Sequence, residues 1–334
     1  MQPGTPSAAP IRVAFLGCGF ITGVHSRHLK ALGGEVVGRY ASRDRTRAVE
    51  FCRRYGGDGV YDDYAAAMSD PELDAVVVAV PPSLHLGLTL QALRSGKHVL
   101  VEKPAFLSLR DFDTVRAARD EADRVVLVGE NDHYKPLAVT LRRLLAEDAI
   151  GELVLAQFTT VARRPKAGDD WRNDEQIAGG DAFFEEGIHW LHLAGSLGPS
   201  ITRIDGYRPA PARDPGPGHD RRVRSMLVAF EYDTGAVGAL YYSREIPSLL
   251  RGVRVSKLYG RNGVITFESN GAGVLVRGRG LPRFLLPGAR DVRGYEAMYR
   301  DFASAVRTGS PPQMSLERAM ADHRLMEQIY RQHD

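Results

Sequence analysis

The sequence has few of the features that mark a secreted, membrane or nucleic-acid-binding protein. It contains only two cysteines, Cys18 and Cys52, in 334 residues. This excludes a disulfide framework and a cysteine-based metal centre, and it fits a reducing cytoplasm. No apolar run approaches the roughly 20 residues of a membrane helix. The formal net charge is only +3, without a dense basic run. We therefore expect a cytoplasmic protein that binds neither a membrane nor nucleic acid.

The length and the order of expected elements predict two domains after a disordered tail. Residues 1–10 are small and proline-rich and are assigned to that tail. Strands alternate with helices over 11–133, which predicts a doubly wound parallel sheet of the α/β class. Over 134–334 the strands are separated by turns, which predicts an α/β domain with a large, mostly antiparallel open sheet. The expected strands are 11–16, 35–41, 59–61, 73–80, 98–101, 125–129, 152–162, 201–208, 223–232, 236–243, 253–259 and 264–268.

Lysine is scarce, with six lysines against thirty-eight arginines, and one of the six has an informative position. Lys103 directly follows the short apolar strand at 98–101 and precedes Pro104, which ends the strand. In a parallel sheet the carboxyl ends of the strands form the edge where ligands bind. Unlike arginine, a lysine in such a site can give up a proton. The alternative is a solvated lysine at a strand end.

A glycine-rich loop follows the first expected strand. Gly17, Gly19 and Gly23 form a Gly-x-Gly-x-x-x-Gly pattern, and the next helix is expected at 24–32. Glycines allow a tight turn and let the backbone approach a pyrophosphate at the helix N-terminus. The strand–loop–helix context predicts dinucleotide binding, with Phe20 and Ile21 also close to the cofactor.

The tip of the second expected strand bears on the choice of dinucleotide. NAD sites usually carry an acidic residue there, which binds the ribose 2′-hydroxyl. This chain has Ser42 and Arg43, a hydroxyl and a planar cation suited to a 2′-phosphate. We therefore expect NADP in preference to NAD. Alternatively, Arg43 stacks on the adenine, or it belongs to the start of the next helix, at Asp44.

Other residues are predicted to face the cofactor or the substrate. His85 lies in the first turn of a helix and either faces the cofactor or is solvated. Trp171 and Arg172 combine an aromatic ring with a cation, which suits covering a nicotinamide or gripping a polyhydroxyl substrate. The alternative is that Trp171 fills the domain junction. The remaining candidates are Pro81, Glu102 and Asn131 for the cofactor and Tyr134 for the substrate.

A second chemical stretch runs from Gly179 to His192. On a helix, Glu185 and His189 share a face, as do His189 and His192. A carboxylate beside an imidazole suits general acid–base catalysis. The set is alternatively a metal site or a structural helix with incidental polar residues; no metal is expected.

Together these stretches resemble the family of glucose–fructose oxidoreductase, inositol dehydrogenase and rhizopine-catabolism enzymes, over about residues 11–330. The resemblance rests on the glycine loop, on Glu102-Lys103-Pro104, on Trp171-Arg172, and on Gly179-Gly180 leading to Gly187-x-His189. It implies that Lys103 and His189 flank the nicotinamide and the reacting carbon. The family usually has Asp where this chain has Glu185, and often Gly where it has Asp181.

The resemblance also implies a function and an assembly. The implied reaction transfers a hydride between NAD(P) and a carbinol or keto carbon of a sugar, a cyclitol, or an amino- or nucleotide-sugar derivative. The alternatives are a redox-cycling glycoside hydrolase or lyase on the same fold, and a non-catalytic dinucleotide-sensing regulator. The open sheet of the second domain is expected to form a homodimer or homotetramer.

Overall fold

The computed structural model describes residues 9–164, 174–210, 224–247 and 254–331. The chain forms two compact units: Met1–Asn131 with Tyr295–Met320, and Asp132–Gly294 with Ala321–Asp334. Most of the expected tail lies outside the described residues, as do Trp171 and Arg172. Among the described residues, no helix combines the length and the apolar character needed to cross a membrane.

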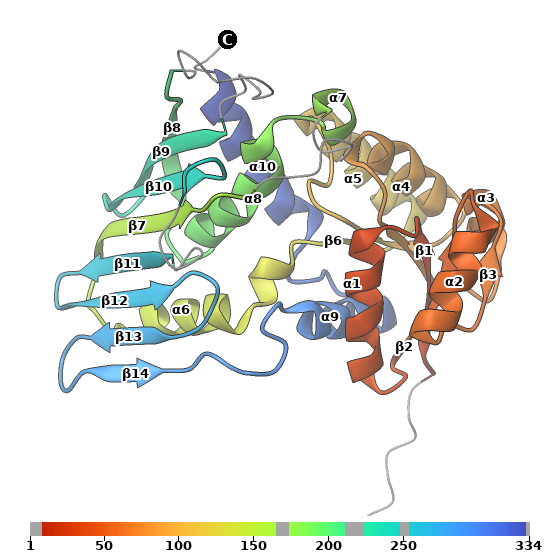
Figure 1. The fold of residues 1–334 in the computed structure, drawn as a ribbon, viewed down its shortest axis with the longest axis horizontal. Coiled ribbons are helices and arrows are strands. Elements are labelled where there is room, and N and C mark those ends of the chain that lie inside the picture. The colour runs from red at the N-terminus through yellow and green to blue at the C-terminus, as the bar shows by residue number, and fades with distance from the viewer. Residues whose placement is uncertain (1–8, 165–173, 211–223, 248–253, 332–334) are drawn as a thin grey trace, which may run out of the picture. The chain divides into compact units, whose positions relative to one another are not determined.

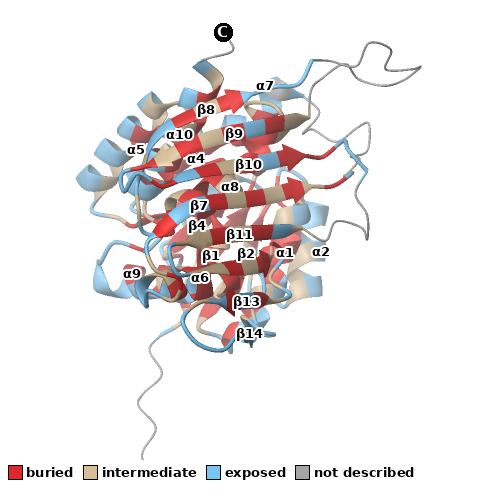
Figure 2. Cartoon of the chain, turned by 90° about the vertical axis from the view of Figure 1, so that its left-hand side faces the viewer, coloured by how far each residue is buried: buried red, intermediate tan, exposed pale blue. Residues whose placement is uncertain are grey.

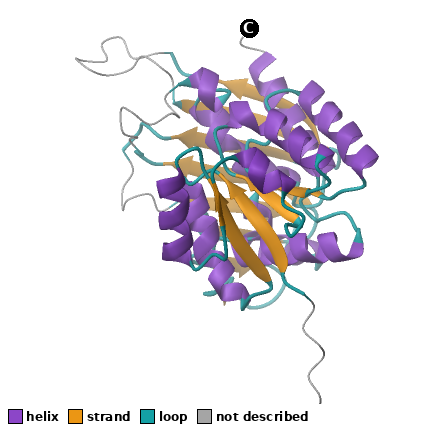
Figure 3. Cartoon of the chain, turned by 90° about the vertical axis from the view of Figure 1, so that its right-hand side faces the viewer, coloured by secondary structure: helices purple, strands orange, loops and turns teal. Residues whose placement is uncertain are grey.

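The first unit is built on a six-stranded parallel sheet in the order β3-β2-β1-β4-β5-β6. Helices lie on both sides of this sheet (Figure 3). The central strands are apolar and almost completely buried, as expected for a parallel sheet covered on both faces. The strands are β1 (Ile11–Leu16), β2 (Val36–Ala41), β3 (Val60–Tyr61), β4 (Ala75–Val78), β5 (His98–Val101) and β6 (Val126–Val128). The α-helices between them are α1 (Phe20–Leu29), α2 (Arg45–Tyr55), α3 (Tyr64–Ser69), α4 (His85–Arg94) and α5 (Leu109–Ala122).

The strand order of the first unit fixes where a ligand can bind. β1 lies between β2 and β4, so the chain reverses its direction of growth across the sheet at that point. Dinucleotides bind outside the carboxyl ends of the strands at such a switch point. The doubly wound parallel sheet predicted from the sequence is thus confirmed.

The last part of the first unit comes from the far end of the chain. Helix α9 (Tyr295–Thr308) and the start of α10 (Leu316–Arg331) group with this unit, although the sequence assigned all of 134–334 to the second domain. Backbone pairing explains the grouping, because the amide of Val128 in β6 donates to the carbonyl of Met314 at 3.1 Å. Arg307 of α9 also pairs with Glu35 at 3.0 Å.

The second unit contains an eight-stranded sheet in the order β14-β13-β12-β11-β7-β10-β9-β8 (Figure 1). It is antiparallel except for the pairing of β7 with β10, which agrees with the mostly antiparallel sheet expected. The strands are β7 (Leu153–Val161), β8 (Ile201–Tyr207), β9 (Ser225–Tyr232), β10 (Val237–Ser243), β11 (Val255–Gly260), β12 (Gly263–Glu268), β13 (Val274–Arg277) and β14 (Arg283–Leu285). The helices are α6 (Pro136–Ala146), α7 (Glu175–Ala178), α8 (Ala182–Gly195) and the part of α10 after Met320.

Within the described part of the chain, helices cover one face of the second sheet. Tyr232 and Tyr242 donate hydrogen bonds from the sheet to the carbonyls of Ala194 and Ala182 at the two ends of α8. The opposite face carries no helix among the described residues, and buried and exposed positions alternate along its strands (Figure 2). This alternation is the period-two pattern of a sheet with one covered face.

Two local features differ from the sequence-based expectation. Helix α1 begins at Phe20, directly after Gly19, and not at Val24. The glycine loop is therefore shorter than expected, and its last glycine lies inside the helix. Strands β13 and β14 were not predicted, because β14 is only three residues long and two of its three residues are exposed.

Candidate active site

The glycine loop has the geometry of a phosphate cradle. Gly17 has φ +107°, and a Cβ there would approach the carbonyl oxygen of Ala79 to 2.7 Å. At Gly19 an added Cβ would meet nothing within 4 Å, so the space beside the loop is open. The N-cap of α1 is Gly19, with no capping side chain and no acidic residue in the first turn. The first amides of this helix therefore suit an anion.

The tip of β2 lies beside this loop. Ser42 is buried and its hydroxyl accepts a hydrogen bond from the amide of Asp44 at 3.2 Å, while Arg43 is exposed. Asp44 caps α2, so the helix begins after the two predicted specificity residues and not at Arg43. Arg47, on the first turn of α2, was not predicted. Its charge acts on the thiol of Cys18 inside the glycine loop, although burial dominates and raises the pKa of Cys18 to about 11.

Lys103 follows β5 at the same edge of the sheet. The preceding residue, Glu102, is buried, and its Oε2 accepts the backbone amide of Lys103 at 3.2 Å. Its Oε1 lies 2.7 Å from Nε2 of His25. Burial raises the pKa of Glu102, but the hydrogen bond and charge of His25, together with the charges of Lys103 and His85, lower it, so the net pKa lies below the usual value. Glu102 was predicted to contact the cofactor; in the structure both of its carboxylate oxygens have protein partners.

His85 lies on the other side of the Lys103 turn. Its ring is fully buried, so it is not solvated. Nδ1 lies 3.0 Å from the carbonyl oxygen of Pro104 and 3.1 Å from that of Ala105, and Nε2 lies 2.9 Å from that of Val80. Burial lowers the pKa of His85. We propose that His85 holds this turn, because Nδ1 lies within hydrogen-bond distance of the carbonyls of Pro104 and Ala105 and can donate there in one tautomer.

Two further cofactor candidates belong to the same unit. Pro81 precedes the short helix Pro82–Leu84, three residues after β4 ends at Val78. Asn131 is buried, and its amide donates to the carbonyl of Gly129 at the end of β6. Both therefore follow the carboxyl ends of parallel strands, where the sequence placed them.

In the second unit, α8 carries the predicted acid–base residues. Asp181 is its N-cap and accepts hydrogen bonds from the amides of Phe183 and Phe184 at 2.9 and 3.0 Å. Asp181 also pairs with Arg208 at 3.1 Å and accepts a hydrogen bond from Tyr330. These contacts give a physical reason for an aspartate where the family often has a third glycine. A capping carboxylate is typically worth about 1 kcal/mol.

His189 has a carboxylate neighbour that the sequence did not indicate. Its Nδ1 lies 3.9 Å from Oδ1 of Asp132, and that same oxygen lies 2.7 Å from Nζ of Lys135. Glu185, the predicted partner, is buried one turn before His189 on α8. Asp132 is 57 residues away along the chain, so helical spacing could not reveal it. The sequence offered only its position shortly after β6.

His192 belongs to a buried chain of polar side chains. Its Nε2 lies 2.9 Å from Nδ1 of His133, and its Nδ1 lies 2.8 Å from Oδ2 of Asp322. All three side chains are buried. Tyr134, also predicted to contact substrate, is buried with its ring edge-on to that of His133 at 5.0 Å. We propose that His192 positions its neighbours in the site and does not contact the substrate, since both ring nitrogens have protein partners.

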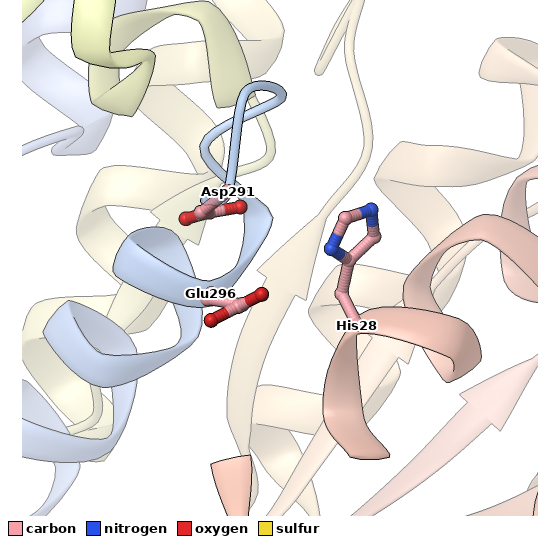
Figure 4. A group of neighbouring side chains, drawn as sticks. All are labelled: His28, Asp291 and Glu296. Atoms are coloured by element: carbon pink, nitrogen blue, oxygen red, sulfur yellow. The ribbon is translucent and has the colours of Figure 1, made fainter. Parts of the chain in front are cut away.

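Pairs of potential metal ligands occur in both units. In the first unit, ligand atoms of His28 on α1 and Glu296 on α9 lie within 4.8 Å of each other (Figure 4). The ring of His28 also stacks on Tyr295 at 5.0 Å. In the second unit, Asp132 and His189 form such a pair. Two ligands do not make a metal centre, and the pairs carry no metal assignment.

Comparison with known proteins places the chain in a family. Residues 11–130 match the model of an oxidoreductase family with an NAD-binding Rossmann fold, and residues 138–266 match the GFO/IDH/MocA C-terminal domain. D-xylose 1-dehydrogenase (NADP(+)) 2 of Haloferax volcanii is 28% identical over 87% of each chain. Myo-inositol 2-dehydrogenase of Thermotoga maritima is 24% identical over 92% of this chain and 91% of its own.

Other relatives match over a shorter stretch. 1,5-anhydro-D-fructose reductase of Ensifer adhaerens is 32% identical, and the match covers 48% of each chain. The chain thus spans about half the length of this relative, and 56% of a dTDP-sugar 3-reductase of Actinomadura kijaniata.

Solved structures share the fold over nearly the whole chain. GenD2 from gentamicin A biosynthesis, in complex with NAD, has a TM-score of 0.81 at 26% identity and covers 99% of this chain and 96% of its own. Levoglucosan dehydrogenase, in complex with NADH and levoglucosan, has a TM-score of 0.82 at 20% identity, covering 96% and 98% of the two chains. With both domain models matched in order, the chain belongs to the GFO/IDH/MocA family of oxidoreductases with an NAD-binding Rossmann fold.

Proposed function

We propose that the protein is an NAD(P)-dependent oxidoreductase that acts on a CH–OH group or the corresponding ketone of a sugar, a cyclitol, or an amino- or nucleotide-sugar derivative. The observation that carries this proposal is the position of Lys103. It follows β5 at the carboxyl edge of the parallel sheet, the edge that also holds the glycine loop after β1. The names of the relatives support the substrate class, because they include dehydrogenases and reductases of sugars and inositols.

The first unit fits a dinucleotide. The loop turns tightly at Gly17, where a Cβ would collide with the carbonyl oxygen of Ala79, and the uncapped start of α1 suits the pyrophosphate. We propose that Ser42 and Arg43 bind the adenosine ribose and favour NADP. When bound, the nicotinamide supplies or accepts the hydride. The protein must then hold the substrate carbon near it and exchange the hydroxyl proton.

Lys103 and His189 are the proposed proton-handling pair. A positioned acid–base group typically contributes about 10²–10⁴ in rate. A lysine ammonium close to the substrate oxygen also stabilises negative charge that develops there. We propose that Asp132, with Glu185 as the alternative, orients the imidazole of His189. Lys103 lies in the first unit and His189 in the second.

The proposal includes an assembly and a location. The open face of the second sheet exposes apolar side chains along adjacent strands, among them Leu155, Leu227, Val237 and Tyr241. We propose that a second copy of this face covers it, in a homodimer or homotetramer. We propose that the assembled enzyme works in the cytoplasm.

The test is Lys103→Ala. Purified protein is incubated with NADP(H) or NAD(H) and a panel of sugars and cyclitols, and the nicotinamide absorbance at ~340 nm is followed. The variant should lose about 10²–10⁴ in kcat, while its dinucleotide Kd stays close to that of the wild type. Unchanged kcat in the variant would refute the role of Lys103. Turnover of a glycoside without net change in NAD(P)H would favour the redox-cycling alternative.

A further inference from the structure

Helix α9 belongs to the first unit and contributes Tyr299 to a buried polar network that includes Glu102, the residue before Lys103. The hydroxyl of Tyr299 lies 2.7 Å from Nδ1 of His25, and Nε2 of the same ring lies 2.7 Å from Oε1 of Glu102. His25 and Tyr299 are completely buried and Glu102 is nearly so. The network therefore joins α1, α9 and the end of β5 in the interior of one unit.

The protonation pattern of this network follows from its partners. Nε2 of His25 faces a carboxylate, so it carries the proton and donates to Glu102. Nδ1 faces the phenol of Tyr299, whose pKa is raised well above its usual value by burial and then by the charge of Glu102. Tyr299 is therefore a neutral phenol and can complete the hydrogen bonding of His25. With both partners in place, both ring nitrogens are hydrogen-bonded, which favours the orientation that faces Glu102.

Glu102 transmits this constraint to Lys103. Its second carboxylate oxygen accepts the amide of Lys103, and its own amide donates to the carbonyl of Val78 on β4. The attraction between Glu102 and Lys103 also contributes to the lowered pKa of the carboxylate. The backbone at which Lys103 begins and the charge beside it thus both depend on where His25 holds Glu102.

We propose that His25 and Tyr299 are positioning residues for Lys103, acting through Glu102. This inference rests on the proposed function, in which Lys103 handles the substrate proton. It assigns a catalytic consequence to α9, which lies about 190 residues after Lys103 in the sequence and outside the expected dinucleotide-binding domain. Neither His25 nor Tyr299 needs to touch the substrate or the cofactor.

The decisive variant is Tyr299→Phe, because it removes one oxygen and keeps the ring that packs in the core. His25→Ala is a poorer probe, since it opens a cavity and leaves the carboxylate of Glu102 buried without its partner. The matched control is Tyr40→Phe. The hydroxyl of Tyr40 is also buried in the first unit and donates to Oγ of Ser26 at 2.9 Å, and not to His25 or Glu102. Both variants therefore lose one buried phenolic hydrogen bond.

The first readout needs no substrate. The protein is labelled with trace acetic anhydride across a range of pH, and the rate at each lysine is read by peptide mass spectrometry. Lys30 and Lys97, in the same unit, serve as internal references. Tyr299→Phe should change the labelling rate of Lys103 relative to these references by threefold or more. Tyr40→Phe should leave that ratio unchanged.

The second readout is catalytic. Tyr299→Phe should lower kcat about tenfold while the dinucleotide Kd, measured by NAD(P)H fluorescence, stays within twofold. Glu102→Gln should likewise lower kcat and leave the dinucleotide Kd nearly unchanged. It keeps the shape of the side chain and removes the negative charge of the carboxylate, which His25 contacts. If Tyr299→Phe matches Tyr40→Phe in both kcat and Lys103 labelling, the inference is overturned and the network is merely structural. If Lys103→Ala retains full activity, the proposed function fails, and the labelling ratio still decides whether Tyr299 acts on Lys103.

Discussion

Arg43 and Ser42 at the tip of β2 determine the expected choice between the two dinucleotides. Arg43 is exposed and Ser42 accepts a hydrogen bond from the amide of Asp44, so a 2′-phosphate would meet an exposed cation and a hydrogen-bonded hydroxyl. Arg43→Ala should weaken NADP(H) by about one to two powers of ten and change NAD(H) little, because a charge-assisted contact is worth roughly 1.5–3 kcal/mol. Fluorescence titration with both dinucleotides measures the difference. Equal binding of both by the wild type, unaffected by Arg43→Ala, would contradict the preference; Arg47→Ala tests whether the neighbouring cation contributes.

Asp132 and Glu185 compete for the role of orienting His189. The structure places Asp132 Oδ1 3.9 Å from the ring, whereas helical spacing and the family resemblance favour Glu185. Asp132→Asn should lower kcat by about tenfold or more. The loss of the acid–base group itself typically costs about 10²–10⁴ in rate, and Asp132 only orients that group. Glu185→Gln should cost less. The measurement is steady-state kinetics of both variants on one substrate, and the reverse ranking would return the role to Glu185.

Individual residues also show which contacts can be predicted from the sequence and which cannot. The glycine loop and Lys103 could be placed because each follows a strand directly, and strand ends at one edge of a sheet converge by topology. The contacts of His25 with Tyr299 and of His189 with Asp132 join positions 274 and 57 residues apart. No periodicity connects such positions, because their proximity is set by how helices pack on the sheet.

At the scale of single elements, the pairing of β5 with β6 depends on an uncharged histidine. Nδ1 of His98 accepts the amide of Val125 at 3.0 Å, which requires that nitrogen to carry no proton. Burial, followed by the charge of Arg124, lowers the pKa of His98 from 6.5 to about 4. The native state therefore binds fewer protons than the unfolded state between these values. The contribution of His98 to the free energy of unfolding is therefore fully present above pH 6.5, and it is lost as the pH falls from 6.5 towards 4.

We expect His98→Asn to remove this pH dependence, because its side-chain oxygen can accept the same amide without titrating. From pH 7 to pH 4.5 the wild type should lose about 1–2 kcal/mol more unfolding free energy than the variant, a figure reduced for the partial exposure of the ring. Urea denaturation at the two pH values measures the difference. Parallel losses in both proteins would show that His98 does not contribute.

Elements differ in how well the sequence predicts them. The central strands of the parallel sheet, β1, β4, β5 and β6, are mainly apolar runs, and their ends were predicted to within two residues. Helix α1 was expected four residues too late because the glycine pattern was interpreted as loop up to Gly23, whereas Gly23 lies inside the helix. A Cβ at Gly23 would approach the hydroxyl of Tyr55 to 2.8 Å, so close packing of α1 against α2 is one reason for glycine there.

At the scale of the whole molecule, the uncovered face of the second sheet is the surface that we expect to bind another protein chain. Leu155 pairs with Val237 across β7 and β10, and Tyr241 pairs with Leu227 across β10 and β9, so two exposed apolar pairs lie on the same face of the sheet. The four are 37–44% exposed in the single chain. Large contiguous apolar patches on soluble proteins usually mark interaction surfaces. An open sheet face of this kind suits an isologous contact with a second copy.

Tyr241→Glu should disrupt that contact, because each copy would place a charge in the centre of the apolar patch. We expect the wild type to elute as a dimer or tetramer in size-exclusion chromatography with light scattering, and the variant to shift towards the mass of one chain. The control is Val139→Glu, which places the same charge on an exposed position of α6 in the same unit, 49% exposed and off the sheet. If Val139→Glu dissociates the protein and Tyr241→Glu does not, the interface lies elsewhere. A wild type that is monomeric at micromolar concentration would rule out assembly through this face altogether.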